Sequence, residues 1–459
     1  MSAKPTAGAG KAPADPLALV RTRGYAGLLL VAAVLGAPIS AAAFGFLALV
    51  NELQSLLWND LPKGLGFHGT PSWWAIPLLV VAGVLVGLTI RYLPGTAGHK
   101  PAHGLSTTGA TRPVDIPGVA LAALASLGAG AVIGPEAPLI ALGSGLAVAA
   151  VQLSRRDLPP QAVAVVGASG SFAAVSTLLG SPLLGAFLLM EASGLGGPLM
   201  GVVLVPGLLA AGVGSLIFVG LGSWTGLGTY SLAIHNVPPA GTPTYGGFAW
   251  ALGIGVLAAL AGTGIRRLGL YLEPRVERRM VLGTALLGLA VGLLALIYAE
   301  ATGKSATEVL YSGQSALNPL LGDRAEYSVG ALVLLVACKS LAYSVSLAGF
   351  RGGPVFPSMF VGAAGGLALS HLPGLPDTAG FAMGIGAMCV SMLRLPMTAV
   401  LLATLLLGTD GLAVMPLVIV AVVVSYFVTL RLAPAPAPGP DAGAAPGAAG
   451  AAAPGPTGP

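Results

Sequence analysis

A pattern of glycine and proline that interrupts apolar sequence occurs twice in this chain. Residues 134–138 read Gly-Pro-Glu-Ala-Pro and residues 353–357 read Gly-Pro-Val-Phe-Pro, a separation of 353 − 134 = 219 residues. A second pair of breaks, at Pro182 and Pro396, repeats at 396 − 182 = 214 residues. Glycine and proline interrupt helical backbone, although proline is tolerated in the first turn of a new helix. Matched breaks at nearly one offset predict two homologous halves, whose interrupted helices meet at the middle of a membrane.

The composition places both halves in a lipid bilayer. Of the 459 residues, 55% are hydrophobic and only 8% are charged, and the mean hydropathy is +0.88. Soluble chains carry about 25% charged residues, so an ordinary soluble domain is excluded. The apolar segments are too long for barrel strands. We therefore predict an all-α membrane fold of two inverted-topology halves, with broken and tilted helices that meet at the midplane.

Apolar runs predict where the helices lie. Two of them, Ala162–Leu178 and Pro182–Ala192, are shorter than the ~20 residues of a full span, so we expect tilted or half-crossing helices there. The polar segment Gly95–Pro117 is predicted to be a cytoplasmic loop or to include a short helix that enters the site. The other predicted helices are Tyr25–Leu49, Trp73–Leu93, Gly118–Val132, Leu139–Leu153, Leu199–Leu221, Gly247–Leu270, Val281–Tyr298, Tyr327–Leu347, Val361–Leu369, Phe381–Leu393, Met397–Leu407 and Leu412–Leu430.

Basic residues indicate which ends of the spans face the cytoplasm. Arg21 and Arg23 precede the first span, and five arginines between 266 and 279 form a predicted connection between two later spans. By the positive-inside rule both sets are cytoplasmic, so the formal net charge of +5 does not predict nucleic-acid binding. Residues 1–15 show no cleavable signal, and we expect a multi-pass protein of a plasma (bacterial inner) membrane. The predicted organisation is a disordered segment 1–20, a first transmembrane half 21–222, an extracellular connection 223–246, a second transmembrane half 247–432 and a disordered Ala/Pro/Gly tail 433–459.

Glu136 is a carboxylic acid inside apolar sequence, which makes it the first candidate for a functional residue. A charged side chain at a bilayer centre costs roughly 3 kcal/mol or more, so such acids usually have a partner or lie on an ion pathway. A helix that begins inside the membrane directs its unpaired N–H groups and positive dipole end at whatever lies ahead. Together these features predict an anion site with a titratable acid beside it. The alternative is a carboxylate that only caps the start of a helix.

At these motifs the chain resembles the CLC chloride channels and proton/chloride antiporters. Residues 134–138 are similar to the Gly-Arg/Lys-Glu-Gly-Pro motif of that family, and residues 353–357 to its Gly-x-Phe-x-Pro motif. The stretch from Gly384 to Tyr426 is also similar to the late helices of the family, and the likeness runs in matching order from about Tyr25 to Leu430. The resemblance implies a homodimer in which each subunit holds its own pathway for chloride or a similar monovalent anion, with protons as coupled partners in the antiporters.

The resemblance also assigns roles to particular residues. Glu136 would be the gating glutamate: when ionised, it competes with an anion for the outer position, and when protonated, it swings away. Backbone amides at the two helix starts would replace part of the water shell of the anion. The residues implied as anion-binding are Gly134, Pro135, Ala137, Val355, Phe356 and Gly98.

Several positions depart from the family pattern. The anion-touching serine of the family would fall near Gly98, and Lys100 would then lie near the inner mouth, where a cation could attract anions. The alternative is that Lys100 and His99 are loop residues and not ligands. The inner glutamate that relays protons would align with Ala192, which leaves the adjacent Glu191 as a candidate for the proton pathway; a cytoplasmic mouth or a dimer contact is the alternative. We expect the last helix of the family, which supplies a tyrosine hydroxyl, to be missing after Arg431. Anion coordination is therefore expected to rest on backbone amides alone.

Three more basic residues lie in or next to apolar runs. Lys339 and Arg394 interrupt such runs, and we expect carboxylate or carbonyl partners for both. Arg351 precedes the second break and is predicted either to add positive potential to an outer vestibule or to be structural.

The sequence also leaves functions other than proton/chloride exchange to be considered. A passive chloride channel and a fluoride-selective transporter both fit the motifs. A membrane-embedded hydrolase would need a pair of acids or a metal, but the five histidines lack ligand spacing and no nucleophile triad is visible. We therefore expect no enzyme, no cofactor and no metal, and we interpret Cys338 and Cys389 as small core residues.

Overall fold

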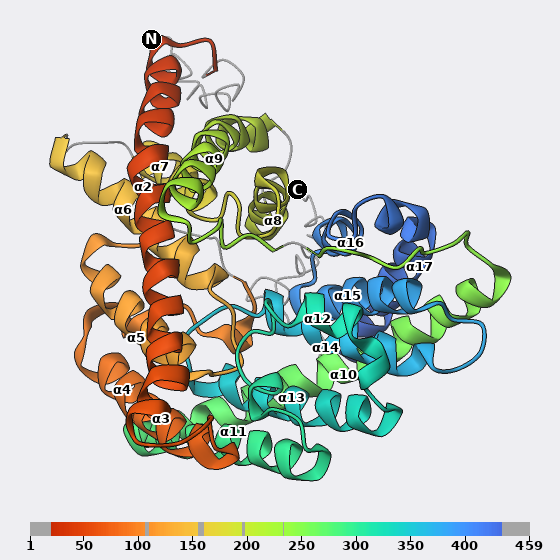
Figure 1. The fold of residues 1–459 in the computed structure, drawn as a ribbon. Coiled ribbons are helices and arrows are strands. Elements are labelled where there is room, and N and C mark those ends of the chain that lie inside the picture. Colours follow the sequence, from red (N-terminus) through yellow and green to blue (C-terminus); the bar gives the residue numbers. More distant parts are fainter. Residues whose placement is uncertain (1–19, 106–109, 155–159, 195–197, 233, 434–459) are drawn as a thin grey trace, which may run out of the picture.

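The computed structural model describes residues 20–105, 110–154, 160–194, 198–232 and 234–433, which are mostly helical (Figure 1). In these ranges, 8 helices are long and apolar enough to cross a membrane by length and composition. The predicted disordered ends lie almost entirely outside the described residues. The helices are α2 (Arg23–Ser55), α3 (Leu61–Gly64), α4 (Ala75–Tyr92), α5 (Ile116–Ala129), α6 (Glu136–Ser154), α7 (Pro160–Ala174), α8 (Pro182–Ser193), α9 (Pro198–Thr225), α10 (Tyr245–Arg278), α11 (Met280–Thr302), α12 (Leu317–Gly322), α13 (Val329–Gly349), α14 (Val355–Ser370), α15 (Asp377–Leu393), α16 (Pro396–Leu405) and α17 (Gly408–Leu432).

The helices pack in two matching sets, as the repeated breaks predict. In the first half, α2 lies against α7 and α9, and α6 lies against α7. In the second half, α10 lies against α15 and α17, and α14 lies against α15. Figure 1 shows the second-half helices α14–α17 gathered on one side of the molecule and α6–α9 on the other, while α4 and α11 lie side by side where the halves meet. The predicted fold of two halves with broken helices is confirmed.

Most predicted helices are present, and the main differences lie at polar segments. Helices α7 and α8 are short, as expected. The predicted end of the helix at Leu270 is wrong, because α10 continues through the basic segment to Arg278 and the break falls at Arg279. Arginine, leucine and glutamate are good helix formers, so the helix extends past its apolar part. That the segment faces the cytoplasm stays a prediction. In the described part of the segment Gly95–Pro117, short 3₁₀ turns precede α5, at Pro94–Ala97, Pro101–His103 and Pro113–Asp115.

Backbone hydrogen bonds join the two Gly-Pro breaks directly. The Gly134 N–H donates to the Gly353 carbonyl at 2.8 Å, and the Gly353 N–H donates to the Gly134 carbonyl at 2.6 Å. This antiparallel bridge is isolated, and among the described residues it lies outside any strand. Broken helix ends leave backbone groups that must be satisfied inside the protein when no water is present. Each break therefore supplies the partners that the other one needs.

A reciprocal pair of serine contacts holds the same junction. Ser346, on α13, accepts a hydrogen bond from the Val132 N–H at 3.1 Å. Ser126, on α5, accepts one from the Arg351 N–H, also at 3.1 Å. Each serine lies on the helix that leads into one break and binds the backbone of the other break. The junction is thus symmetric in its hydrogen bonds as well as in its sequence.

Glycines set the distance between each new helix and its neighbour. A Cβ atom on Gly143 of α6 would lie 2.3 Å from the Gly170 carbonyl oxygen of α7. In the second half, a Cβ atom on Gly362 of α14 would lie 2.2 Å from the Gly384 carbonyl oxygen of α15. Small residues allow backbones to approach closely in membranes, where packing rather than hydrophobicity drives helix association. The two helix pairs use this device at matching positions.

The buried cation Lys339 is held by carbonyl groups, as expected. Its side chain is 0% exposed, and its Nζ atom donates to the carbonyl oxygens of Glu308, Val309 and Leu310 at 2.9, 3.2 and 2.8 Å. The ring of Phe360 lies 4.3 Å from Nζ. Charges away from water need such partners, so Lys339 fixes the segment before α12 on α13. Arg394 is instead exposed, at the C-terminal end of α15.

Candidate functional site

Glu136 lies at the junction of the two breaks, at the first position of α6. The side chain is 0% exposed, and its Oε1 atom accepts a hydrogen bond of 2.5 Å from the Val355 N–H. The backbone amides of Phe356 and of Glu136 itself also interact with the carboxylate. The Oε2 atom is buried and has no hydrogen-bond partner among the described residues. A carboxylate of the first half thus lies where the N-terminus of α14, in the second half, presents its free amides.

Two glycines make room for this carboxylate. A Cβ atom on Gly134 would lie 2.0 Å from Oε2 of Glu136, and one on Gly353 would lie 2.2 Å from Cδ. The proline after each glycine has no N–H group to satisfy. Each Gly-Pro sequence lies just before a new helix begins, after α5 has ended at Ala129 and α13 at Gly349. The two sequences leave a space of carboxylate size between the halves.

A tyrosine side chain holds the backbone of the second break through a hydrogen bond. Val355 and Phe356 are both 0% exposed at the start of α14. The Tyr343 hydroxyl, on α13, donates to the Pro354 carbonyl at 2.7 Å. This bond fixes the turn that aims the Val355 N–H at Glu136. Sequence reasoning did not single out Tyr343, and the only signal was a tyrosine in an apolar run.

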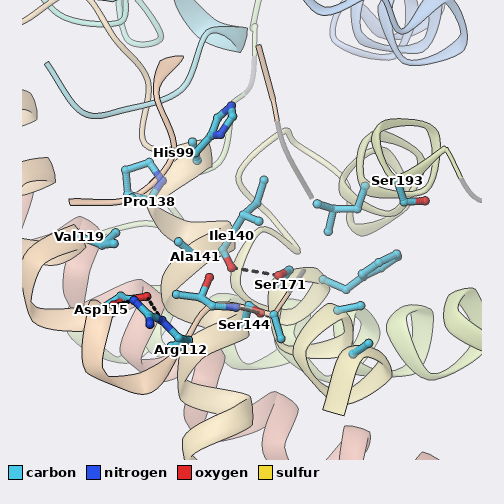
Figure 2. Close-up of a pocket in the computed structure, with 18 of the residues that line it drawn as sticks. His99, Arg112, Asp115, Val119, Pro138, Ile140, Ala141, Ser144, Ser171 and Ser193 are labelled. Atoms are coloured by element: carbon cyan, nitrogen blue, oxygen red, sulfur yellow. Dashed lines mark hydrogen bonds and ion pairs between the residues drawn. The ribbon is translucent and has the colours of Figure 1, made fainter. Parts of the chain in front are cut away.

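A cavity of about 780 Å³ opens beside the junction. Its wall includes Ala137 and Pro138 of α6, Gly352 before the second break, and Gly98 and His99 of the loop after α4. Figure 2 shows Pro138, Ile140, Ala141 and Ser144 along one side of this cavity and His99 at another part of its wall. The cavity thus connects the loop that sequence analysis assigned to an inner mouth with the start of α6.

The predicted anion-binding residues fall into two groups. Gly134, Pro135, Val355 and Phe356 are buried together with Glu136 at the junction, and Ala137 lies between the junction and the cavity. Gly98 lies only in the cavity wall. The structure therefore separates a tight position at the helix starts from a wide space beside it.

Glu191 does not itself line this cavity, although Leu189, Met190 and Ser193 of the same helix do, and it binds a third helix start. Its carboxylate accepts hydrogen bonds from the Met397 N–H at 3.0 Å, from the Thr398 N–H at 2.8 Å and from the Thr398 hydroxyl at 2.7 Å. A carboxylate at this position satisfies free amides and complements the helix dipole of α16. Glu191 therefore links α8 of the first half to α16 of the second half.

Lys100 is paired rather than free. Its ammonium group binds Glu273 at 2.8 Å and also binds Glu277, both on α10. These hydrogen bonds raise the pKa of Lys100 above its usual value. His103 also binds Glu273, at 3.0 Å. The loop of the first half is thus tied to α10 of the second half, and its lysine charge is neutralised there.

No metal centre is visible in the part of the chain that the structure describes. No group of three or more His, Cys, Asp or Glu side chains in these residues could hold a metal ion. Cys338 and Cys389 are both buried with free thiols. The polar groups that the structure brings together at the junction include the Glu136 carboxylate and backbone amides.

The described residues form a mostly helical fold with 8 candidate membrane spans, in which backbone amides at paired helix breaks hold a buried carboxylate. Helix starts that meet inside a membrane are typical of anion-transport proteins. The chain belongs to the voltage-gated chloride channel family, whose sequence profile matches residues 82–430. The match covers both breaks and excludes the two ends of the chain.

Curated relatives share most of this length. A protein of Escherichia fergusonii named "Putative ion-transport protein YfeO" is 28% identical over 362 residues, which are 76% of this chain and 80% of that protein. A protein of the same name from Escherichia coli is 29% identical over 364 residues, with the same shares covered.

Solved structures share the fold. A CLC-type fluoride/proton antiporter aligns with a TM-score of 0.64 and 18% identity, covering 88% of this chain and 96% of the other. A slow cyanobacterial Cl⁻/H⁺ antiporter aligns with a TM-score of 0.69 and 18% identity, covering 88% and 94%. At this identity the likeness shows the fold alone.

Proposed function

We propose that the protein moves chloride or a similar monovalent anion across a membrane, with Glu136 as the gate. One observation carries the proposal: the carboxylate of Glu136 binds the amide at the start of α14, with its two oxygens buried between the halves. A helix start that holds a carboxylate can also hold a free anion, because both offer negative charge to the same N–H groups. The side chain therefore occupies an anion position.

The gate works by competition and protonation. When ionised, Glu136 binds the Val355 N–H and excludes an anion from that position. When protonated, the side chain loses most of its attraction to the helix start, so it leaves and an anion takes its place. This exchange links anion movement to a proton, and we propose proton coupling on this ground. Two solved structures of similar fold are titled as proton antiporters, one for chloride and one for fluoride, so both anions belong in the test.

We further propose that the protein works as a homodimer in a plasma membrane. Exposed apolar side chains on α9 and α17 support an apolar environment: Leu216 is 74% exposed, Val219 53%, Val423 57% and Phe427 57%. Lipid or a second copy of the chain would cover them. The measurement is the mass of the detergent-solubilised protein by light scattering, and a monomer over the whole accessible concentration range would contradict the dimer.

The experiment for the function is ion flux from liposomes. Purified wild-type protein should dissipate a chloride gradient and take up protons, at a rate that depends on pH. Glu136→Gln mimics the protonated acid, so it should abolish proton uptake while anions still flow. Glu52→Gln, which changes an exposed glutamate of α2, is the matched control and should behave as the wild type. No chloride or fluoride flux at any pH would overturn the function, and full proton-coupled exchange in Glu136→Gln would overturn the gate.

A further inference from the structure

Arg351 is a buried guanidinium whose partners are carbonyl groups. The residue is only 5% exposed. Its Nε atom donates to the Thr96 carbonyl at 3.3 Å, and its Nη1 atom donates to the carbonyls of Gly349 and Phe350 at 3.5 and 3.4 Å. These distances are longer than the usual 2.7–3.2 Å for such bonds. The side chain is held in place, but its Nη2 atom makes no hydrogen bond to a residue that the structure describes.

Arg351 forms no ion pair with an acid in the described part of the chain. The carboxylates of Glu273 and Glu277 attract the guanidinium through space, but the ion pairs of both acids are with Lys100. Buried charges in proteins are normally paired, since carbonyls satisfy donors but do not neutralise charge. A mobile anion would complete this environment.

Arg351 faces the cavity beside the junction. It lines the space of about 780 Å³ together with Ala137, Pro138 and Gly352. Gly352 precedes the glycine that forms the bridge between the two breaks. Arg351 therefore lies at the end of the cavity that borders the breaks. Arg351 thus shares the wall of this cavity with Gly98. The outer vestibule proposed for Arg351 and the inner mouth implied for the loop of Gly98 both stay predictions.

The loop itself is not built to present a side chain at Gly98. Gly98 has φ 91° and ψ −165°, a region that is essentially restricted to glycine. A Cβ atom there would also lie 3.1 Å from a methyl group of Val119. The neighbouring Thr96 and Ala97 also have positive φ angles, 50° and 58°. In this conformation the Thr96 carbonyl points to Arg351, so the loop orients the guanidinium in place of carrying a ligand of its own.

We propose that Arg351 is the side-chain ligand of the transported anion in this cavity. The inference rests on the proposed anion transport and replaces the expectation that backbone amides act alone. A guanidinium offers a planar fork of N–H donors with a permanent charge. A monovalent anion in the cavity would bind this fork and then move to the helix starts when Glu136 leaves.

Chloride binding tests the proposal apart from flux. Isothermal titration calorimetry with chloride would compare wild-type protein with Arg351→Gln and Arg351→Lys. We expect about tenfold or more weaker binding in Arg351→Gln and an intermediate loss in Arg351→Lys, which keeps the charge but loses the fork. Arg91→Gln removes the same charge from the exposed end of α4 and should bind as the wild type. Unchanged affinity in Arg351→Gln, or an equal loss in Arg91→Gln, would overturn the proposal.

A second measurement covers the case in which Arg351→Gln does not fold. Crystals of wild-type protein grown with bromide would show anomalous density in contact with the guanidinium of Arg351. Bromide density only elsewhere, or none in the cavity, would contradict the proposal. The two proposals fail under different outcomes. If the wild type transports anions but the Arg351 variants bind chloride as tightly as the wild type, only the role of Arg351 is wrong. If the wild type transports no anion, the proposed function is wrong.

Discussion

The two helix breaks share a backbone plan but differ in one decisive side chain. Both read Gly-Pro-x-x-Pro, and the bridge between Gly134 and Gly353 pairs them directly. The third position is Glu136 in the first break and Val355 in the second. The carboxylate of Glu136 binds the N–H of Val355, so equivalent residues of the two halves meet as acceptor and donor. An internal repeat thus builds a symmetric frame, to which the first half adds the acid that we propose as the gate.

Equivalent glycine substitutions in the two halves should lower the stability of the fold by similar amounts. Gly143→Ala and Gly362→Ala both place a methyl group against a backbone carbonyl, at 2.3 and 2.2 Å, which no side-chain movement relieves. We expect each to destabilise the fold by about 3 kcal/mol or more, measured as a fall in Tm of the detergent-solubilised protein. Gly365→Ala, on α14 with nothing within 4 Å of its Cβ position, is the control. A large effect in one half only would break the equivalence.

Substitution of the glycines next to Glu136 should lower the stability less, because the Glu136 side chain can move away from the added methyl group. Gly353→Ala would overlap Cδ, Oε1 and Cγ of Glu136, while Gly134→Ala would overlap Oε2 most closely. We expect a loss of about 2 kcal/mol for Gly353→Ala and a smaller loss for Gly134→Ala. Adding Glu136→Ala should restore much of the stability of Gly353→Ala, and a double-mutant cycle measures this coupling. Additive losses would mean that the glycine does not serve to make room for the carboxylate.

The contact between α8 and α16 is asymmetric, and this difference can be measured. Glu191 caps α16 through three hydrogen bonds, whereas Leu405 occupies the equivalent place in the second half. We expect Glu191→Ala to cost about 1.5 kcal/mol through the lost charged hydrogen bonds, again read as Tm. Leu405→Ala, at a half-exposed position, should cost less. If Glu191→Ala also removes proton uptake in liposomes at normal anion flux, the predicted proton pathway gains direct support.

The smallest expected effects concern the two serines of the junction. Ser126→Ala and Ser346→Ala each remove an acceptor from a backbone N–H of the opposite break. We expect each to cost about 1 kcal/mol, with nearly additive losses if the two bonds are independent. Hydrogen exchange at the amides of Val132 and Arg351 would show which bond each variant opens. Loss of both bonds in either variant would show that the junction opens as a unit.

Much of this site could be predicted because its signals are local. The glycines and prolines of residues 134–138 and 353–357 interrupt helices wherever they occur, and an acid in apolar sequence calls for a partner. The repeat at a fixed offset then implied that the two breaks meet. Lys339 likewise had to find buried partners, and it binds three carbonyls. The end of α10 was missed because charge was taken to mark a loop, although arginine and glutamate favour helix.

The sequence by itself determined the membrane class, the two halves, the breaks and the candidate acid. These features can be recognised from short stretches of sequence, because they depend on hydropathy and on the backbone preferences of glycine and proline. Only the tertiary structure decided which groups face each other across the halves: Glu136 with the Val355 amide, Glu191 with the start of α16, and Arg351 with a cavity next to the loop of Gly98. These partners lie more than 200 residues apart in the chain, and no local pattern encodes the packing that brings them together.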